Sequence, residues 1–113
     1  MDDKLKEEFS KKESFQGFIK VTDNPVSSLN SEQKAILNRK GNVMFNEGNI
    51  ENARRIYTTT GYSDGLTRVG KVYEEKNESI KALKQYVLAH NKSKAEPIYQ
   101  DIAKVISLLL KEN

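Results

Sequence analysis

The chain has 113 residues, a net charge of +3, 36% hydrophobic residues and 31% charged residues. This length suits one domain, and the low apolar content predicts a thin core beneath a strongly hydrated surface. The absence of cysteine excludes disulfides, thiolate metal sites and thiol nucleophiles.

Membrane insertion and secretion are not expected from the pattern of apolar residues. No apolar run approaches the roughly 20 residues that a membrane-spanning helix needs. The segment from Met1 to Lys4 leads into further charged residues rather than into an apolar signal region. We therefore expect a cytoplasmic protein with no membrane-inserted segment.

Residues 1–30 differ from the rest of the chain and are predicted to form an N-terminal arm and linker. This segment carries five Lys and six Asp or Glu, a balance of −1, whereas residues 31–113 carry +4. Leu5 and Phe9 are spaced for one weak helical stripe, and Phe15 and Phe18 belong to a short aromatic patch. Two interpretations stay open: a flexible tail, or an arm whose Phe15 and Phe18 dock loosely onto the helical body or onto a partner.

From residue 31 onward the pattern predicts helices, so the fold class is all-α with a helical domain over residues 31–113. A first helical hairpin is expected over about residues 31–60. Asn30 or Ser31 is suited to capping its first helix. Gly48 supplies a left-handed residue for the turn between the two helices, and Gly61 ends the second.

A second hairpin is expected over about residues 63–90. Asn77 stands in its turn where the first hairpin has Gly48, and asparagine tolerates the left-handed conformation.

A closing helix is expected over about residues 94–111. Ser93 and Glu96 match a capping box, with Pro97 in the first turn. Helical spacing defines an apolar stripe of Ile98, Ile102, Val105, Ile106 and Leu109.

The two predicted hairpins repeat each other at a constant offset, the distance from Leu37 to Leu66 in the sequence. Each copy has the order Leu, Gly, bulky apolar residue, Ala, Tyr. The first copy has these residues at Leu37, Gly41, Met44, Ala53 and Tyr57, and the second at Leu66, Gly70, Tyr73, Ala82 and Tyr86. A repeat of this length is typical of stacked helical hairpins, because one such unit cannot bury its own apolar face.

Over about residues 33–91 this order resembles the tetratricopeptide repeat, a helix–turn–helix unit of 34 residues. In that family a small residue and an alanine let the two helices approach, and an aromatic residue fills the gap between units. The resemblance implies two stacked hairpins closed by a C-terminal solvating helix. The shorter period of this chain is a departure and predicts a shortened second helix in the first copy. The alternative is a five-helix bundle in which the echo is accidental.

The resemblance also implies a non-catalytic adaptor, because peptides lie along the concave face of tetratricopeptide proteins, formed by the first helix of each hairpin. Asn42 is interpreted as an amide that captures a peptide backbone through both donor and acceptor. For any one of these positions an ordinary solvated helix face is the alternative. The partner-binding candidates are Asn38, Arg39, Asn42, Phe45, Asn46, Arg68 and Lys71.

Two other binding hypotheses remain. Tyr99, Leu108 and Leu110 extend the apolar surface of the last helix beyond one stripe, which suggests self-association into a homodimer. The +4 charge of residues 31–113 suggests nucleic-acid binding more weakly, because its basic residues are not densely clustered.

An enzyme is the least expected class. No pair of acid–base groups appears at workable spacing, and the single histidine, His90, has no readable partner. We therefore predict no catalytic residue, no metal ligand and no cofactor.

Overall fold

The computed structural model describes Pro25 and residues 27–111, and within them the chain forms five α-helices and no strand. The all-α class is therefore confirmed. The predicted arm falls almost wholly outside the described residues, and with it the docking suggested for Phe15 and Phe18. The helices are α3 (Ser31–Asn46), α4 (Ile50–Thr60), α5 (Ser63–Glu75), α6 (Ser79–Leu88) and α7 (Lys92–Lys111).

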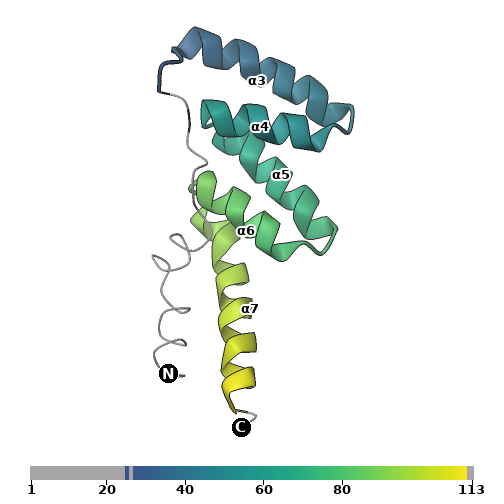
Figure 1. Ribbon diagram of the computed structural model, residues 1–113, viewed down its shortest axis with the longest axis vertical. Coiled ribbons are helices and arrows are strands. Elements are labelled where there is room, and N and C mark those ends of the chain that lie inside the picture. Colours follow the sequence, from purple (N-terminus) through teal and green to yellow (C-terminus); the bar gives the residue numbers. More distant parts are fainter. Residues whose placement is uncertain (1–24, 26, 112–113) are drawn as a thin grey trace.

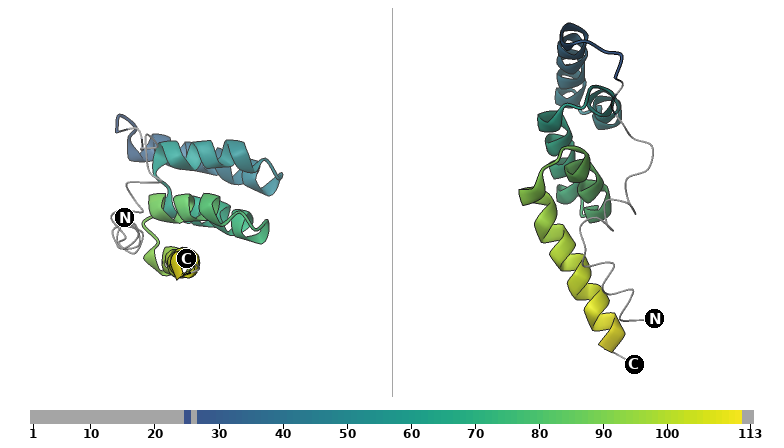
Figure 2. Two further views of the ribbon diagram at one scale, coloured as in Figure 1. Left: turned by 60° about the horizontal axis from the view of Figure 1, so that its bottom comes forward. Right: turned by 90° about the vertical axis from the view of Figure 1, so that its left-hand side faces the viewer.

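Consecutive helices pack against each other along the chain. The most extensive contacts join α3 to α4 and α5 to α6, and smaller ones join α4 to α5 and α6 to α7. Figure 1 shows these helices stacked in chain order, with α3 at one end and α7 at the other. Only the first part of α7 lies against α6, and its C-terminal half extends beyond the other helices (Figures 1 and 2).

Each of the first four helices is followed by a residue with left-handed backbone. These residues are Gly48, Gly61, Asn77 and His90, with φ of 86°, 73°, 61° and 57°. The next N–H then bonds back across the turn, as from Asn49 to the Met44 carbonyl at 2.8 Å and from Glu78 to the Tyr73 carbonyl at 2.8 Å. The left-handed turns predicted at Gly48 and Asn77 are confirmed, and His90 performs the same backbone role before α7.

The start of α7 differs from the prediction. The helix begins at Lys92, and the side-chain oxygen of Asn91 accepts the Lys94 backbone N–H at 3.2 Å. Asn91 therefore caps the helix, and the capping box predicted at Ser93 and Glu96 is wrong. Pro97 consequently lies beyond the first turn, inside the helix.

Two tyrosines form the centres of the core, and both are completely buried. Tyr57 packs with Ala53, Leu66 and Val69, and Tyr86 packs with residues of α6 and α7. A Cβ atom built at Gly41 would lie 2.8 Å from Cε1 of Tyr57, and one at Gly70 would lie 2.5 Å from Cε1 of Tyr86. Glycine at both repeated positions therefore permits this close approach, since a Cβ would force the tyrosine ring to shift.

Candidate interaction surface

The predicted partner-binding residues divide into two groups in the structure. Asn38, Asn42, Phe45 and Arg68 are partly buried, and each contacts another helix or its side chains. Arg39, Asn46 and Lys71 are exposed. Only the second group is therefore presented fully to a partner.

Asn42 holds α3 to both α4 and α5. Its side-chain oxygen accepts a hydrogen bond from the Tyr57 hydroxyl at 2.7 Å and another from Nη2 of Arg68 at 2.8 Å. A carbonyl oxygen has two lone pairs, so these donors fill its acceptor capacity. The predicted capture of a peptide backbone by both ends of this amide is therefore wrong, because its acceptor end is used within the fold.

Arg68 extends from α5 into this contact. Its guanidinium carbon lies 5.4 Å from the Phe45 ring centroid and 5.8 Å from that of Tyr57. A cation over aromatic faces is attracted by their quadrupoles. Burial raises the pKa of Tyr57, while the charge of Arg68 acts in the opposite direction. Arg68 therefore joins α5 to α3 and α4, and only part of its side chain is exposed to a partner.

Asn38 makes a comparable contact near the far end of α4. Its side-chain oxygen accepts a hydrogen bond of 2.6 Å from the hydroxyl of Thr60, which is itself buried. This bond fixes α3 against α4. It spans 22 positions in the sequence, so helical periodicity gives no signal for it.

Helix α5 supplies an acidic residue to the face formed by α3 and α5, called here the α3–α5 face. The Tyr86 hydroxyl donates a hydrogen bond to the Glu74 carboxylate on α5. Burial, with a further contribution from this carboxylate, raises the pKa of Tyr86 well above its usual range. The α3–α5 face thus combines the exposed cations Arg39 and Lys71 with the carboxylate of Glu74.

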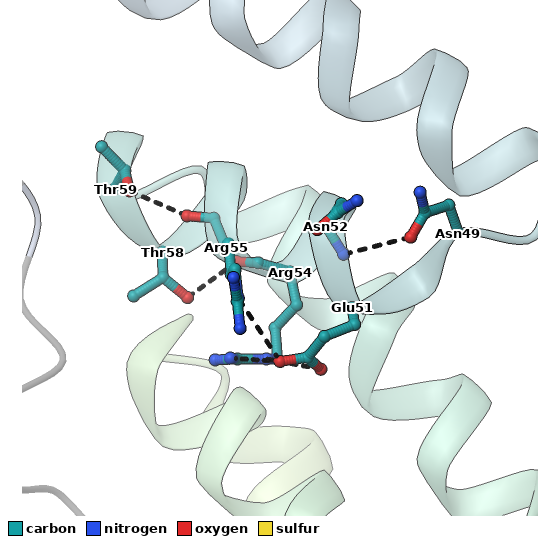
Figure 3. Close-up of polar contacts among 7 residues, drawn as sticks. All are labelled: Asn49, Glu51, Asn52, Arg54, Arg55, Thr58 and Thr59. Carbon is teal, nitrogen blue, oxygen red and sulfur yellow. Dashed lines mark hydrogen bonds and ion pairs between the residues drawn. The ribbon is translucent and has the colours of Figure 1, made fainter.

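A second polar surface lies on α4, where Glu51 and Arg54 point toward α6 (Figure 3). Nη2 of Arg54 bonds to the Glu51 carboxylate at 2.7 Å, and Nε of Arg55 lies 3.8 Å from it. The Arg54 guanidinium holds the pKa of Glu51 below its usual value. The hydroxyls of Thr58 and Thr59 donate to backbone carbonyls one turn earlier, at 2.8 Å each. Glu51 therefore offsets only part of the positive charge that Arg54 and Arg55 carry on this helix.

The exposed apolar residues of α7 differ from those that the sequence singled out. Tyr99 is 7% exposed and packs into the core cluster with Tyr86, so it is not available to a second chain. Leu108 is exposed, as expected, and Leu110 is partly buried. Val105 and Leu109, predicted on the inward stripe, are exposed instead, because the second half of α7 runs past α6.

Searches for membrane spans and metal sites extend over the described part of the chain. There, no helix has the length and apolar character to cross a bilayer. In the same residues, no cluster of three or more His, Asp or Glu side chains is arranged to hold a metal ion.

Comparison with known proteins places the chain in a family. It is 43% identical over 93 residues to an uncharacterized protein of Treponema pallidum (strain Nichols), and the match covers 82% of this chain and 89% of that protein. The chain therefore belongs to the same family as this treponemal protein. No protein-family model matches the chain, and no solved structure does.

Proposed function

We propose that the chain is a non-catalytic interaction module of tetratricopeptide type, which binds a peptide or helix of another protein along the α3–α5 face. The observation that carries this proposal is the shared packing unit of the two hairpins. In each, a glycine on the first helix lies against a buried tyrosine on the second: Gly41 against Tyr57, and Gly70 against Tyr86. Close packing of this kind at repeated positions favours a repeat protein over an accidental echo.

The position of α7 also supports the proposal. Its start at Lys92 follows the start of α5 at Ser63 by one full period of the repeat, so the repeat continues into it. Ala95 and Ile98, one period after Leu66 and Val69, are buried in the cluster with Tyr86. This register supports α7 as the counterpart of a first helix in a third unit, the role of a closing helix that covers the stack.

The surface offered to a ligand is narrower than the sequence suggested. With Asn42 and Arg68 occupied between the layers, the binding residues are Arg39, Asn46 and Lys71 together with the uncovered part of Phe45. Arg39 and Lys71 are cations, which favours ligands that carry carboxylates. Such binding weakens with added salt because exposed charges are screened.

The test uses the full chain as bait for a phage-displayed library of random peptides. The affinity of a selected peptide is then measured by fluorescence anisotropy. Combining Arg39→Glu with Lys71→Glu is expected to weaken binding by at least about tenfold, through lost attraction and new repulsion.

The control variant is Arg55→Glu, on the outward side of α4, where the arginine side chain is 71% exposed. Like the two test substitutions, it replaces a positive charge by a negative one, but at a surface outside the proposed site. Its affinity for the peptide should therefore stay within about twofold of that of the wild type. Equal weakening by Arg55→Glu, or no effect of the double variant while circular dichroism shows an intact fold, would contradict the proposed face.

A further inference from the structure

A polar hollow of about 330 Å³ is formed by side chains of α4, α5 and α6 and is called here the α4–α6 hollow. Its volume lies at the lower end of the range for small-molecule pockets. Figure 3 shows Glu51 and Arg54 of α4 directed toward α6. Every residue that lines the hollow carries a polar group, and these residues are Glu51, Arg54, Tyr73, Lys81, Lys84 and Gln85.

Positive charge predominates around the α4–α6 hollow. Three of the lining residues are cations, and one, Glu51, is acidic. Two further charged residues pair with this set: Nε of Arg55 lies 3.8 Å from the Glu51 carboxylate, and the Glu78 carboxylate lies 2.9 Å from Nζ of Lys81. With these included, four cations and two carboxylates leave the set with a net charge of +2. An anion with two negative charges would balance it.

The cations reach the hollow from two helices. Lys81, Lys84 and Gln85 are spaced by three and four positions, so they share one face of α6. From α5, the Tyr73 ring lies between the charged groups, with its centroid 5.7 Å from Nζ of Lys81. Burial raises the pKa of Tyr73, whereas the charges of Arg54 and Lys81 act in the opposite direction. Cations of α4 and α6 therefore act on the same small region.

Two of the lining residues are polar at positions where the other copy of the repeat is apolar. One period separates Arg54 from Leu83, and one period separates Ile56 from Gln85. Leu83 is fully buried in the core, whereas the Arg54 side chain is 19% exposed. Stacking of the hairpins needs only apolar residues at such positions. Departures from a packing pattern of this kind are typical of functional sites.

The Gln85 amide adds an unpaired polar group. The residue is 2% exposed, and its side-chain oxygen has no hydrogen-bond partner within the described part of the chain. Buried polar groups without a partner are rare in folded proteins, because leaving one unpaired costs free energy. Rotation about the last side-chain bond exchanges oxygen and nitrogen, so this amide can turn its N–H donors toward a ligand.

We propose that the α4–α6 hollow binds a phosphate group, either as free phosphate or as the phosphate ester of a small molecule. A phosphate ester carries close to two negative charges near neutral pH and has three strong acceptor oxygens. It can therefore accept hydrogen bonds from guanidinium, ammonium and amide groups on different helices at once. A carboxylate has one charge and two oxygens in a plane, so it would balance only half of the net charge.

The phosphate site is separate from the proposed peptide-binding face. Arg39, Asn46 and Lys71 do not line the α4–α6 hollow. A failure of peptide binding would therefore leave this proposal standing, and the reverse also holds.

The test is an NMR titration of the isotope-labelled full chain with sodium phosphate at constant ionic strength. Saturable shifts are expected for the Gln85 side-chain amide, with a dissociation constant of about 1 mM or lower. A parallel titration with glycerol phosphate distinguishes the sources, because tighter binding of the ester indicates a phosphorylated small molecule and tighter binding of phosphate indicates the free ion. Acetate should bind at least about tenfold more weakly than phosphate, because it carries less charge.

A double variant tests the cations. Lys81→Gln combined with Lys84→Gln should weaken phosphate binding by at least about tenfold, because two attracting charges are lost. The matched control is Lys40→Gln combined with Lys104→Gln. It removes the same charge from exposed lysines of α3 and α7 that do not line the hollow, and it should leave the affinity within about twofold.

Two single variants should change the affinity in opposite directions. Gln85→Met removes the amide and keeps the length of the side chain. It should weaken phosphate binding by about fivefold without lowering the stability measured by urea denaturation, because the amide oxygen has no partner to lose. Glu51→Gln removes a carboxylate that repels the ligand and should strengthen binding by about threefold. An unfolded variant could not show such a gain.

Three results would overturn the proposal. The first is the absence of saturable shifts at Gln85 with either phosphate probe. The second is acetate binding as tight as phosphate binding, which would make the hollow a carboxylate site. The third is equal weakening by the Lys81 and Lys84 variant and by its control, which would mean that the ion responds only to the overall charge of the protein.

Discussion

The two buried tyrosines share their packing and differ in their polar partners. Tyr57 and Tyr86 are both fully buried beside a glycine of the preceding helix. The Tyr57 hydroxyl donates to the Asn42 amide, which also accepts from Arg68, whereas the Tyr86 hydroxyl donates to a carboxylate. The repeat thus preserves the apolar contacts that stack the helices, while the polar residues beside them have diverged.

Two differences between the copies account for the different polar partners of the tyrosines. The position one period after Asn42 is Lys71, whose ammonium group has donors and no acceptor. The Tyr86 hydroxyl needs an acceptor and finds it at Glu74, which corresponds to Phe45 in the first hairpin. The Asn42 contact with Arg68 is therefore specific to the junction of α3, α4 and α5.

The largest expected effect breaks a second glycine contact of Tyr57, made by Gly65 on α5. A Cβ at Gly65 would lie 2.5 Å from Cγ and Cδ1 of Tyr57, at the base of the ring, which cannot move away without shifting the α4 backbone. We expect Gly65→Ala to cost about 3 kcal/mol of unfolding free energy, measured by urea denaturation.

Gly41→Ala is the matched control for this prediction. Its Cβ would meet Tyr57 at 2.8 Å, at an outer ring atom. The better helix propensity of alanine offsets about 1 kcal/mol of the strain, so a net cost of about 1 kcal/mol is expected. If Gly65→Ala proves as stable as Gly41→Ala, the packing of the Tyr57 ring between α3 and α5 cannot be as tight at Gly65 as the structure indicates.

The sequence predicts those features of the two tyrosine environments that depend on residue type and on spacing along the chain. Residue type alone indicates the left-handed turns at Gly48 and Asn77, and register indicates the repeated glycines and tyrosines. The predicted start of α7 is wrong because Asn91 and Ser93 are both good caps, and only the preceding turn decides between them. The sequence gives no indication of the role of Gly65, since its contact with Tyr57 joins two different helices, α5 and α4.

The candidate interaction surface is harder to predict, because its contacts also join residues of different helices. The tetratricopeptide resemblance predicts that Asn42 and Arg68 reach one groove, but it does not predict their bond, which joins residues 26 positions apart. Periodicity also places Val105 and Leu109 on the inward stripe. Whether that stripe is covered depends on where α6 ends beside α7, which is a property of packing and not of either helix.

The next largest expected effect is the loss of unfolding free energy when the hydroxyl of Tyr86 or Tyr57 is removed. Tyr86→Phe removes a hydrogen bond to a charged acceptor and should cost about 1.5 kcal/mol, whereas Tyr57→Phe should cost about 1 kcal/mol, because Arg68 still donates to Asn42. Urea denaturation at pH 7 measures both. A greater cost for Tyr57→Phe would contradict this difference between the acceptors.

The same two tyrosines predict a decline of stability in alkali. Burial raises the pKa of both from the usual value of 10.0, Glu74 adds to the effect at Tyr86, and Arg68 opposes it at Tyr57. A raised pKa gives stability that is complete below pH 10 and is lost as the pH rises further, because the unfolded chain ionises first. Tyr86→Phe should therefore flatten the fall in unfolding free energy above pH 10 more than Tyr57→Phe does.

The smallest expected effect distinguishes the ion pairs at the starts of α4 and α6. At the start of α4, both Nε and Nη2 of Arg54 donate to the Glu51 carboxylate, whereas at the start of α6 a single lysine, Lys81, lies 2.9 Å from Glu78. Glu51 is 55% exposed, so water screens the pair, and Glu51→Gln should cost at most about 0.5 kcal/mol at pH 7. Glu78→Gln should cost less, because a lysine lacks the forked geometry of the guanidinium.

The pH dependence of the Glu51→Gln effect identifies its origin. Arg54 lowers the pKa of Glu51 below 4.5 in the folded chain, so the pair contributes stability above that pH and loses it as the carboxyl group is protonated. The difference between the wild type and Glu51→Gln should therefore disappear on acidification below pH 4.5 and shrink with added salt. A difference that persists under both conditions would assign the role of Glu51 to packing, because neither protonation nor screening removes a packing contact.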